Sequence, residues 1–328
     1  MNILIIKLGA IGDVIRTTSI LPGLKVKYKN CKIDWITKSE SFDVLKNNPL
    51  ISNIYLMGKN LLKPAKIKDF RGTKNQSLVS EFVAHSHSTD FLVKSNKKYD
   101  LVINLDDDYE TCEMATKVNA KKIIGSYLKN NEKTYTKDSS PWFDMGLISR
   151  FGKKAADEIK AKNKKTYQEI IYKILGLNYK KQEPILILNK KELSFGRKFA
   201  KKNNMGETDA VIGINTGAGG RWEDKKLSIG KTAELIDKLN RNIKNAKLIL
   251  FGGPEERERN EKIKKIVKTK IIDAGCNNSL MEFASLVNLC SVLVTSDSLA
   301  LHTGVALKKK IVCFFCPTPS AEIELYSR

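Results

Sequence analysis

The stretch Asn2-Ile-Leu-Ile-Ile-Lys-Leu-Gly9-Ala10-Ile11-Gly12-Asp13 combines a short apolar run with a turn that holds two glycines. The run is rich in β-branched residues, which predicts a buried parallel strand over residues 3–8. Apolar residues recur at helical spacing after Asp13, which predicts a helix over residues 14–28. A strand, a tight turn and a helix in this order are typical of open α/β sheets, which bind ligands at the carboxyl ends of their strands. The sequence therefore predicts an α/β fold with Asp13 at such a strand end.

Asp13 has two interpretations at this point. Before a helix it can be an N-cap, a position that favours aspartate. At a strand end it can instead be a catalytic carboxylate. The spacing of Gly9 and Gly12 differs from the G-x-G-x-x-G of dinucleotide-binding turns and from the P-loop, so neither of those nucleotide sites is indicated here.

A second strand, polar turn and helix lie near the other end of the chain. Residues 292–296 predict a strand, and Asp297 and Ser298 then stand at the start of a helix, where free N–H groups and the helix dipole attract anions. His302 follows about one helical turn later and is expected to face the same end of the sheet. The alternative is a capped helix that carries a partly buried histidine. Two such turns in one chain favour a cleft between two α/β domains.

A third turn of this kind follows a strand predicted over residues 210–214. It reads Asn215-Thr-Gly-Ala-Gly-Gly220 and leads to Lys225 and Lys226. Glycines let the backbone approach a ligand closely, and lysines can neutralise phosphate oxygens. The next predicted strand ends at Gly252-Gly-Pro-Glu-Glu256, with acids in the first helical turn. A glycine-rich loop alone is weak evidence for phosphate, but its place in an alternating β–α series favours that role.

The alternating pattern predicts two domains, residues 1–180 and 181–328, joined by a linker at residues 179–184. Each is expected to be a Rossmann-like parallel sheet, and the two to face a central cleft. A basic segment, residues 59–74, is expected to be a loop. The predicted strands of the first domain are 3–8, 33–37, 54–56, 101–104 and 122–125, and its helices are 14–28, 41–47, 77–95, 110–118 and 165–175. The predicted helices of the second domain are 191–203, 228–242, 255–267 and 279–289, with further strands at 247–251 and 311–315.

The composition indicates in which cellular compartment the protein is expected. The 328 residues include no apolar run of about 18 residues and no basic-then-apolar leader, so we expect no transmembrane segment and no export. The six cysteines are then expected to be reduced thiols. Cys313 and Cys316 have the C-x-x-C spacing of metal and redox sites, but they lie in or after an apolar strand without a second pair, which favours packing.

The formal net charge of +22 is spread over both halves, about +13 over residues 1–180 and about +9 over the remainder. No recognised nucleic-acid-binding motif is present, and no basic patch is interleaved with aromatic residues, so we expect no nucleic-acid partner. Attraction to an anionic membrane surface or to a phosphorylated glycolipid explains the charge better. A lysine-rich composition of the whole proteome is the alternative.

Five stretches together resemble the ADP-heptose:lipopolysaccharide heptosyltransferases and their relatives, which are glycosyltransferases of the GT-B architecture. They cover nearly the whole chain in the expected order, so the resemblance is specific for the family and much less so for the substrate. The stretches are I-K-L-G-A-I-G-D-V at the N-terminus, Y-D-L-V-I-N-L-D from Tyr99, N-T-G-A-G-G-R-W-E-D-K from Asn215, F-G-G-P-E-E from Phe251, and D-S-L-A-L-H from Asp297 with its following C-P-T.

The resemblance implies transfer of heptose from ADP-heptose to a lipopolysaccharide-core or related glycan acceptor, with inversion and with no metal or other cofactor. Asp13 is then the general base, and Lys7 and Arg16 contact an acidic acceptor or keep Asp13 ionised. The alternative for Lys7 and Arg16 is plain surface charge. The acceptor is expected to be an acidic glycolipid at the membrane surface, which places the protein in the cytoplasm, at the inner face of the cytoplasmic membrane. The ADP-sugar donor is expected to contact residues of the second domain: Thr216, Gly217, Gly219, Lys225, Glu255, Glu256, Asp297, Ser298, Leu299 and His302.

Two departures from the family pattern bear on these expectations. Chains of this architecture usually continue past the C-P-T segment to a last helix that returns to the first domain, whereas this sequence stops at Arg328, which suggests a truncated second domain or a missing tail. Leu227 also stands where the family often has an aromatic residue.

Three other functions are compatible with all or part of the pattern. A glycosyltransferase that uses another nucleotide sugar or a protein acceptor shares all of it. A degenerate ADP-sugar-binding protein would bind ADP without turnover. A nicotinamide-dependent oxidoreductase is also α/β, but neither half has the glycine spacing that such enzymes need.

Overall fold

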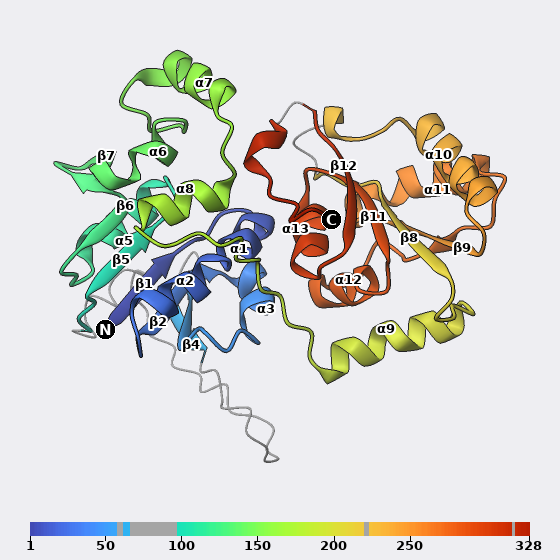
Figure 1. The fold of residues 1–328 in the computed structure, drawn as a ribbon, viewed down its shortest axis with the longest axis horizontal. Coiled ribbons are helices and arrows are strands. Elements are labelled where there is room, and N and C mark those ends of the chain that lie inside the picture. Colours follow the sequence, from blue (N-terminus) through green and yellow to red (C-terminus); the bar gives the residue numbers. More distant parts are fainter. Residues whose placement is uncertain (58–61, 66–96, 220–222, 317–318) are drawn as a thin grey trace. The chain divides into compact units, whose positions relative to one another are not determined.

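A computed structural model describes residues 1–57, 62–65, 97–219, 223–316 and 319–328. The chain forms two compact units, both built from strands and helices in alternation (Figure 1). The first unit contains Met1–Pro184 and Ala321–Glu324, and the second contains Ile185–Ser320 and Leu325–Arg328.

The first unit is built on a seven-stranded sheet with the order β4-β3-β2-β1-β5-β6-β7. The five central strands are parallel, and β4 and β7 pair antiparallel at the two edges. Residues 3–6 are completely buried, because helices cover both faces of a parallel sheet. The strands are β1 (Asn2–Ile6), β2 (Lys32–Lys38), β3 (Asn53–Met57), β4 (Leu62–Ala65), β5 (Leu101–Asn104), β6 (Ile123–Lys129) and β7 (Glu132–Tyr135).

The first unit has two short helices where the sequence predicts one long helix. The predicted helix over residues 14–28 is wrong, because α1 (Ile11–Thr17) ends and α2 (Ile20–Lys27) begins within it. Pro22 has no N–H to donate to the carbonyl of Thr18, so a regular helix cannot run through this point. The other helices are α3 (Phe42–Leu45), α5 (Tyr109–Lys117), α6 (Ser140–Phe143), α7 (Gly152–Lys162) and α8 (Tyr167–Ile174), with 3₁₀ turns at Ser39–Ser41 and Lys137–Ser139.

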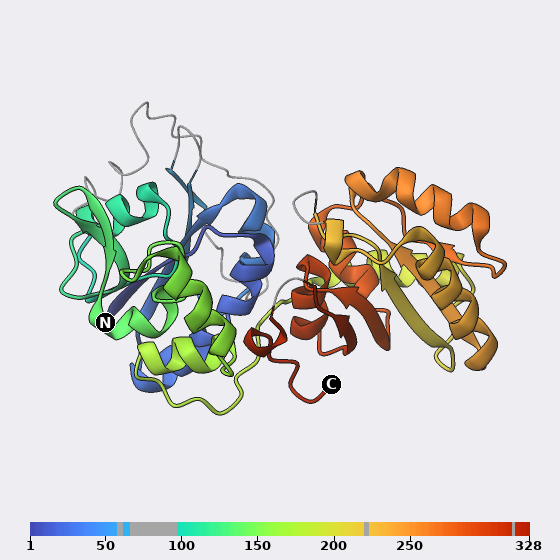
Figure 2. The same ribbon diagram turned by 90° about the horizontal axis from the view of Figure 1, so that it is seen from above.

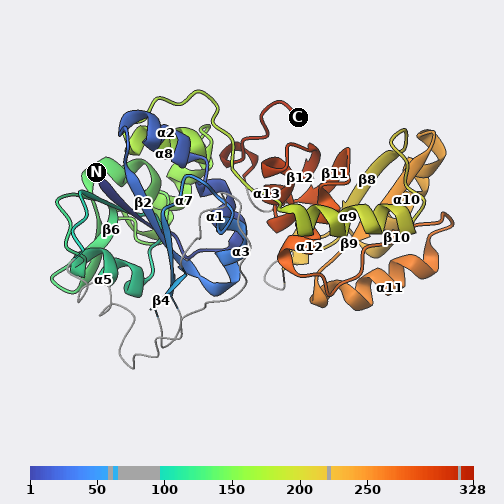
Figure 3. The same cartoon turned by 90° about the horizontal axis from the view of Figure 1, so that it is seen from below.

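The second unit has a five-stranded, fully parallel sheet with the order β10-β9-β8-β11-β12. Two layers of helices enclose it: α10 and α11 lie toward the viewer of Figure 2, and α9 lies toward the viewer of Figure 3. Its strands are β8 (Ala210–Asn215), β9 (Ala246–Phe251), β10 (Ile272–Asp273), β11 (Val292–Ser296) and β12 (Lys310–Phe314). Its helices are α9 (Lys190–Lys202), α10 (Ile229–Asn242), α11 (Arg257–Ile266), α12 (Leu280–Val287) and α13 (Leu299–Ala306), with 3₁₀ turns at Glu223–Lys225, Pro254–Glu256 and Ser320–Glu322.

Each sheet contains a point where the strand order reverses. In the first unit β1 has β2 on one side and β5 on the other, and in the second unit β8 lies between β9 and β11. Open α/β sheets bind their ligands outside the carboxyl ends of the two strands that flank such a point. The loops after β1 and β5, and those after β8 and β11, are therefore where ligand sites are expected.

Several predicted elements differ from the structure. The loop predicted over residues 59–74 is wrong at residues 62–65, which form β4. The strand predicted over residues 3–8 ends at Ile6, so Lys7 already belongs to the turn. The helix predicted over residues 77–95 lies outside the described residues. The short strands β7 and β10 were not predicted, because four and two residues are too few to show a period.

Candidate active site

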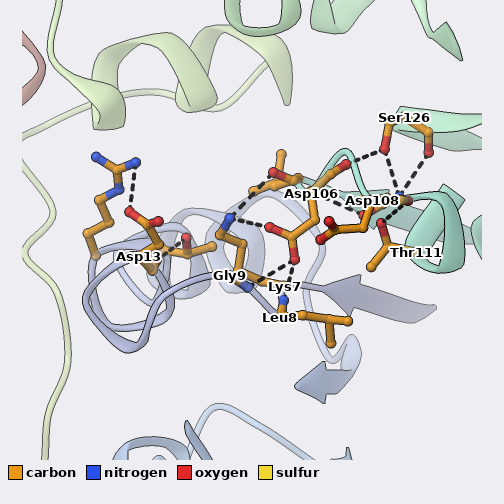
Figure 4. A network of polar contacts seen from close by, with 12 residues as sticks. Lys7, Leu8, Gly9, Asp13, Asp106, Asp108, Thr111 and Ser126 are labelled. Carbon is orange, nitrogen blue, oxygen red and sulfur yellow. Dashed lines mark hydrogen bonds and ion pairs between the residues drawn. The ribbon is translucent and has the colours of Figure 1, made fainter. Parts of the chain in front are cut away.

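The turn after β1 is fixed by one carboxylate from the loop after β5. The Asp106 side chain forms an ion pair with the ammonium of Lys7 and accepts the backbone N–H groups of Leu8 and Gly9, the latter at 3.2 Å (Figure 4). Lys7 and Asp106 are each 7% exposed. A Cβ atom at Gly9 would lie 2.9 Å from Lys7 Nζ and 3.2 Å from Asp106 Oδ1, so the turn passes close to the ion pair. One buried ion pair thus determines the path of the chain into α1.

Asp106 is itself held by the neighbouring strands. Its backbone N–H donates to Asn104 Oδ1 at 3.2 Å, and its carbonyl accepts the hydroxyl of Ser126. Asn104 Nδ2 donates in turn to Ser126 Oγ at 2.8 Å. Because buried polar groups with several satisfied bonds are rigid, the carboxylate presents a fixed acceptor to the β1 turn.

Lys7 is affected by two carboxylates. Burial alone would lower the pKa of Lys7, but the negative charges of Asp106 and Asp13 outweigh it and raise that pKa above its ordinary value of 10.5. Lys7 is therefore an ammonium at neutral pH, and its charge is close enough to Asp13 to stabilise the ionised form of that carboxylate. Its burial favours this role over direct contact with an acceptor, the other role that the sequence leaves open.

Asp13 lies in the first turn of α1 and is not its cap. The N-cap residue is Ala10, without a side-chain cap bond, so the interpretation of Asp13 as the N-cap is wrong. The helix begins earlier than predicted because residues 11 and 12 already have helical geometry. Asp13 Oδ1 lies 2.9 Å from Arg16 Nη2, and the Asp13 side chain is 32% exposed. It is thus a carboxylate that solvent can reach at the carboxyl end of β1.

Arg16 is held in place by aromatic rings. Its guanidinium carbon lies 4.1 Å from the ring centre of Tyr167 and 5.7 Å from that of Trp142. The Tyr167 hydroxyl is 2.7 Å from Thr17 Oγ1, which anchors α8 on α1. Cation–π contacts of this kind limit the movement of a guanidinium, so Arg16 presents a fixed charge to Asp13. Neither aromatic residue was predicted from the sequence, because they come from a segment without a motif.

In the second unit, Asn215 joins the loops on either side of the reversal point. Its side-chain amide Nδ2 donates to Gly217 O at 2.7 Å, to Thr295 Oγ1 at 3.1 Å and to Ser298 Oγ at 3.3 Å. The glycine-rich loop after β8 and the turn after β11 are therefore in direct contact. The sequence suggested both loops as parts of a donor site but did not indicate Asn215, which joins them.

Asp297 is the centre of a charged group beside this contact. Lys225 Nζ lies 2.9 Å from Asp297 Oδ2, and His302 Nε2 lies 3.9 Å from Asp297 Oδ1. Ser298 is the N-cap residue of α13 and Leu299 its first helical residue, so their backbone N–H groups lie at the positive end of the helix. The structure thus brings together Lys225, Asp297, Ser298, Leu299 and His302.

The two adjacent acids predicted for the donor site differ in placement. Glu256 is buried, accepts the N–H of Gly253 at 3.0 Å and lies 3.5 Å from Lys226 Nζ. A Cβ atom at Gly217 would lie 2.9 Å from Glu256 Oε2, so the glycine-rich loop passes directly over this acid. Glu255 is exposed on the 3₁₀ turn. Glu256 is thus the acid that the loop contacts.

The remaining predicted donor residues lie on the same loop. Thr216 is buried, and its hydroxyl lies 2.6 Å from Asn260 Oδ1 and 3.0 Å from Phe251 O, so it attaches the loop to β9 and α11. Gly219 has a φ of +74°, a left-handed conformation that favours glycine. Thr216 therefore has a structural partner already, whereas Gly217 and Gly219 shape the path of the loop.

Neither a metal cluster nor a membrane-spanning helix is found in the described ranges. No group of three or more His, Cys, Asp or Glu residues there is arranged to hold a metal ion. Cys316 is exposed and Cys313 half-buried, and burial together with the charge of Asp297 raises the pKa of Cys313 to about 12. Cys313 is therefore a protonated thiol at neutral pH. Among these residues no helix is both long enough and apolar enough to cross a membrane.

The fold is that of known bacterial glycosyltransferases. A glycosyl transferase family 9 structure from Veillonella parvula DSM 2008 superposes with a TM-score of 0.72 at 21% identity, over 97% of this chain and 82% of that one. Escherichia coli ADP-heptose lps heptosyltransferase II superposes with a TM-score of 0.61 at 15% identity, over 98% of this chain and 86% of that one. E. coli heptosyltransferase WaaC with ADP superposes with a TM-score of 0.57 at 16% identity, over 100% of this chain and 95% of that one. The two α/β units therefore have the GT-B fold of the heptosyltransferase structures, as predicted.

The sequence comparison assigns the family. The model of glycosyltransferase family 9 (heptosyltransferase) matches residues 94–328, so the chain belongs to this family, as the resemblance implied. Lipopolysaccharide heptosyltransferase 3 of E. coli is 26% identical over 129 residues, which are 39% of this chain and 33% of that protein. Lipopolysaccharide heptosyltransferase 1 of Campylobacter coli is 28% identical over 102 residues, 26% of this chain and 30% of that protein. The chain thus matches about a third of each curated relative's length.

Proposed function

We propose that this protein is an inverting glycosyltransferase that moves heptose from ADP-heptose to a lipopolysaccharide-core or related glycan acceptor, without a metal. The observation that carries the proposal is the group around Asp297, at the reversal point of the second sheet, in a chain of family 9. Structures of WaaC with ADP and with ADP-2-deoxy-2-fluoro heptose support an ADP-sugar as the donor.

The second unit is proposed to hold the donor. Its diphosphate carries negative charge, and the residues that can stabilise it are Lys225 and the N-terminal amides of α13. Asp297 orients Lys225 and can accept hydrogen bonds from sugar hydroxyls, while His302 can donate a hydrogen bond to a phosphate oxygen. Glu256 lies under the glycine-rich loop, where it can accept a hydrogen bond from a ribose hydroxyl.

The first unit is proposed to supply the base. Asp13 accepts the proton of the acceptor hydroxyl while that oxygen forms a bond to the anomeric carbon. The bond from this carbon to the phosphate oxygen breaks, and ADP leaves with the electron pair. Lys7 and Arg16 keep Asp13 ionised before the transfer, because each places a positive charge near it. Arg16 is the residue that can also contact an acidic acceptor, because its side chain is slightly more exposed than that of Lys7, 12% against 8%.

The acceptor is proposed to be an acidic glycolipid at the inner face of the cytoplasmic membrane. The net charge of +22 supports this location, because a positively charged protein is attracted to an anionic membrane surface. The family membership supports a glycan acceptor.

Titration calorimetry with ADP, UDP and GDP tests the donor site. We expect ADP to bind best, and Lys225→Ala to weaken ADP binding at least about tenfold, because one charge-assisted contact contributes about 1.5–3 kcal/mol. Lys238→Ala is the matched control, since Lys238 pairs with Glu234 on the exposed face of α10. Equal ADP affinity in both variants would contradict the assignment of the donor site. Preference for UDP or GDP would indicate a different nucleotide sugar.

A further inference from the structure

The loop between α6 and α7 is rigidly attached to the first sheet. The Tyr135 hydroxyl at the end of β7 accepts both the backbone N–H and the Nε–H of Arg150, each at 3.0 Å. The Arg150 guanidinium also lies 4.5 Å from the Tyr135 ring centre and 3.3 Å from Asp144 Oδ1. These contacts fix both ends of the stretch between Asp144 and Arg150, so its conformation is set by the sheet.

This fixed loop presents two large apolar side chains to solvent. Leu147 is 86% exposed and Phe151 is 56% exposed, and they lie four residues apart in the chain. Exposing them is unfavourable, because their apolar area would be better removed from water. Nothing in the fold of the unit requires them to be apolar, since neither belongs to the core. Their position indicates a contact with something outside the unit.

The helix that follows carries a dense positive charge. Ala156 is the buried residue of α7, and most of the other residues of the helix face solvent. Figure 1 shows α7 at the periphery of the first unit, beyond α6. Over residues 147–165 the sequence contains seven Lys or Arg residues against two Asp or Glu residues, a net charge of +5. The exposed basic residues are Arg150, Lys153, Lys154, Lys162, Lys164 and Lys165.

We propose that this surface, residues 147–165, docks the protein on an anionic phospholipid bilayer. Apolar side chains that sit beside lysines suit the membrane interface: Leu147 and Phe151 enter the boundary between headgroups and acyl chains, and the lysines are attracted to the anionic headgroups. Charge complementarity selects a bilayer over a second copy of the chain, because two surfaces of charge +5 repel each other. The proposal deepens the proposed function by naming the surface that would bring the enzyme to a glycolipid acceptor.

Sedimentation of the intact protein with lipid vesicles tests this proposal. We expect binding to phosphatidylcholine vesicles that contain phosphatidylglycerol, and at least about tenfold weaker binding to pure phosphatidylcholine vesicles. The double substitution Leu147→Ser, Phe151→Ser and the double substitution Lys153→Gln, Lys154→Gln should each weaken binding at least about fivefold. Val312→Ser is the control for the apolar pair, because Val312 is also 56% exposed but lies on β12. Lys262→Gln is the control for the charges, on the exposed face of α11.

Two outcomes would overturn the proposal. In one, the Leu147/Phe151 variant binds anionic vesicles as tightly as the parent. In the other, light scattering shows that the parent is a dimer and that this variant is a monomer, which would make the surface a contact between copies. Failure of the proposed function is distinguishable, because ADP binding and transfer to a lipid-free acceptor are measured without vesicles and should be unchanged in these variants.

Discussion

The Lys7 ammonium and the Asp106 carboxylate are almost completely removed from water at the carboxyl ends of β1 and β5. Such a pair gives little net stability relative to apolar residues, but loss of one partner is costly because the other charge stays buried. The pair also holds the amides of Leu8 and Gly9, so it connects the stability of the first unit with the conformation of the turn before Asp13.

Asp106→Asn is expected to lower the free energy of unfolding of the first unit by about 3 kcal/mol, because the Lys7 ammonium loses its countercharge. Urea denaturation followed by tryptophan fluorescence measures this, since Trp35 Nε1 lies 3.5 Å from the carbonyl of Lys7. Asp157→Asn is the control: it breaks the exposed Lys153–Asp157 pair and should cost less than about 0.5 kcal/mol. If Asp106→Asn lowers the free energy of unfolding as little as the control does, the Lys7–Asp106 pair does not stabilise the first unit.

The same pair predicts a dependence on pH. Because the pKa of Lys7 is raised in the folded state, its contribution to stability is complete below the ordinary value of 10.5 and is lost as the pH rises through the raised pKa. The difference in unfolding free energy between the parent and Asp106→Asn should therefore have its largest value at about pH 8 and be smaller at about pH 11.

Some of these residues could be predicted from the sequence and others could not. Asp13, Lys225 and His302 could be named because each follows a strand and a turn that the apolar pattern reveals. Asp106 also follows a predicted strand, but its pairing with Lys7 depends on β1 and β5 being neighbours, which the sequence order does not show. Trp142 and Tyr167 could not be named, because their contact with Arg16 depends on how α6, which carries Trp142, and α8, which carries Tyr167, pack in the first unit.

The helices that begin at strand ends are the elements on which the proposed chemistry depends. α13 begins at Leu299, and Ser298 before it is extended, with φ −152° and ψ 178°. A proline at Ser298 would need a φ of about −65° and would strain the turn, so it is not a clean test of the amides. A proline at Leu299 is compatible with the first helical position and with an extended residue before it.

Leu299→Pro is therefore expected to weaken ADP binding about tenfold while the fold is kept, because it removes one N–H group from the anion-binding end of α13. Leu299→Ala keeps that N–H group and is the matched control, with an affinity expected within about threefold of the parent. Calorimetry gives both affinities, and circular dichroism shows whether the proline variant is folded. A folded Leu299→Pro protein that binds ADP as well as Leu299→Ala would place the diphosphate elsewhere.

Element boundaries show what a single sequence can predict. Long periodic segments such as α9 and α10 were predicted within about one residue, because their apolar spacing and N-caps agree. The break between α1 and α2 was missed, because the helical spacing continues across it while Pro22 interrupts the hydrogen bonds. The antiparallel edge strands β4 and β7 were missed because pairing at a sheet edge, and not apolar content, makes them strands.

At the scale of the whole molecule, the α/β class and the family could be predicted from the sequence, because strand-turn-helix signals repeat along the chain and short motifs occur in a family-specific order. The substrates could not, because they depend on side chains around the bound sugars that the motifs do not include. We propose that this chain transfers a heptose and does not merely bind a nucleotide.

Mass spectrometry of the products tests that claim most directly. The intact protein is incubated with ADP-heptose and a truncated lipopolysaccharide-core acceptor, beside Asp13→Asn as the matched variant. We predict that the parent releases ADP and adds one heptose to the acceptor. Asp13→Asn should bind ADP with near-normal affinity but form product at least about a hundredfold more slowly, the usual loss when a general base is removed. ADP binding by the parent without any acceptor of increased mass, or equal product from both proteins, would contradict the account.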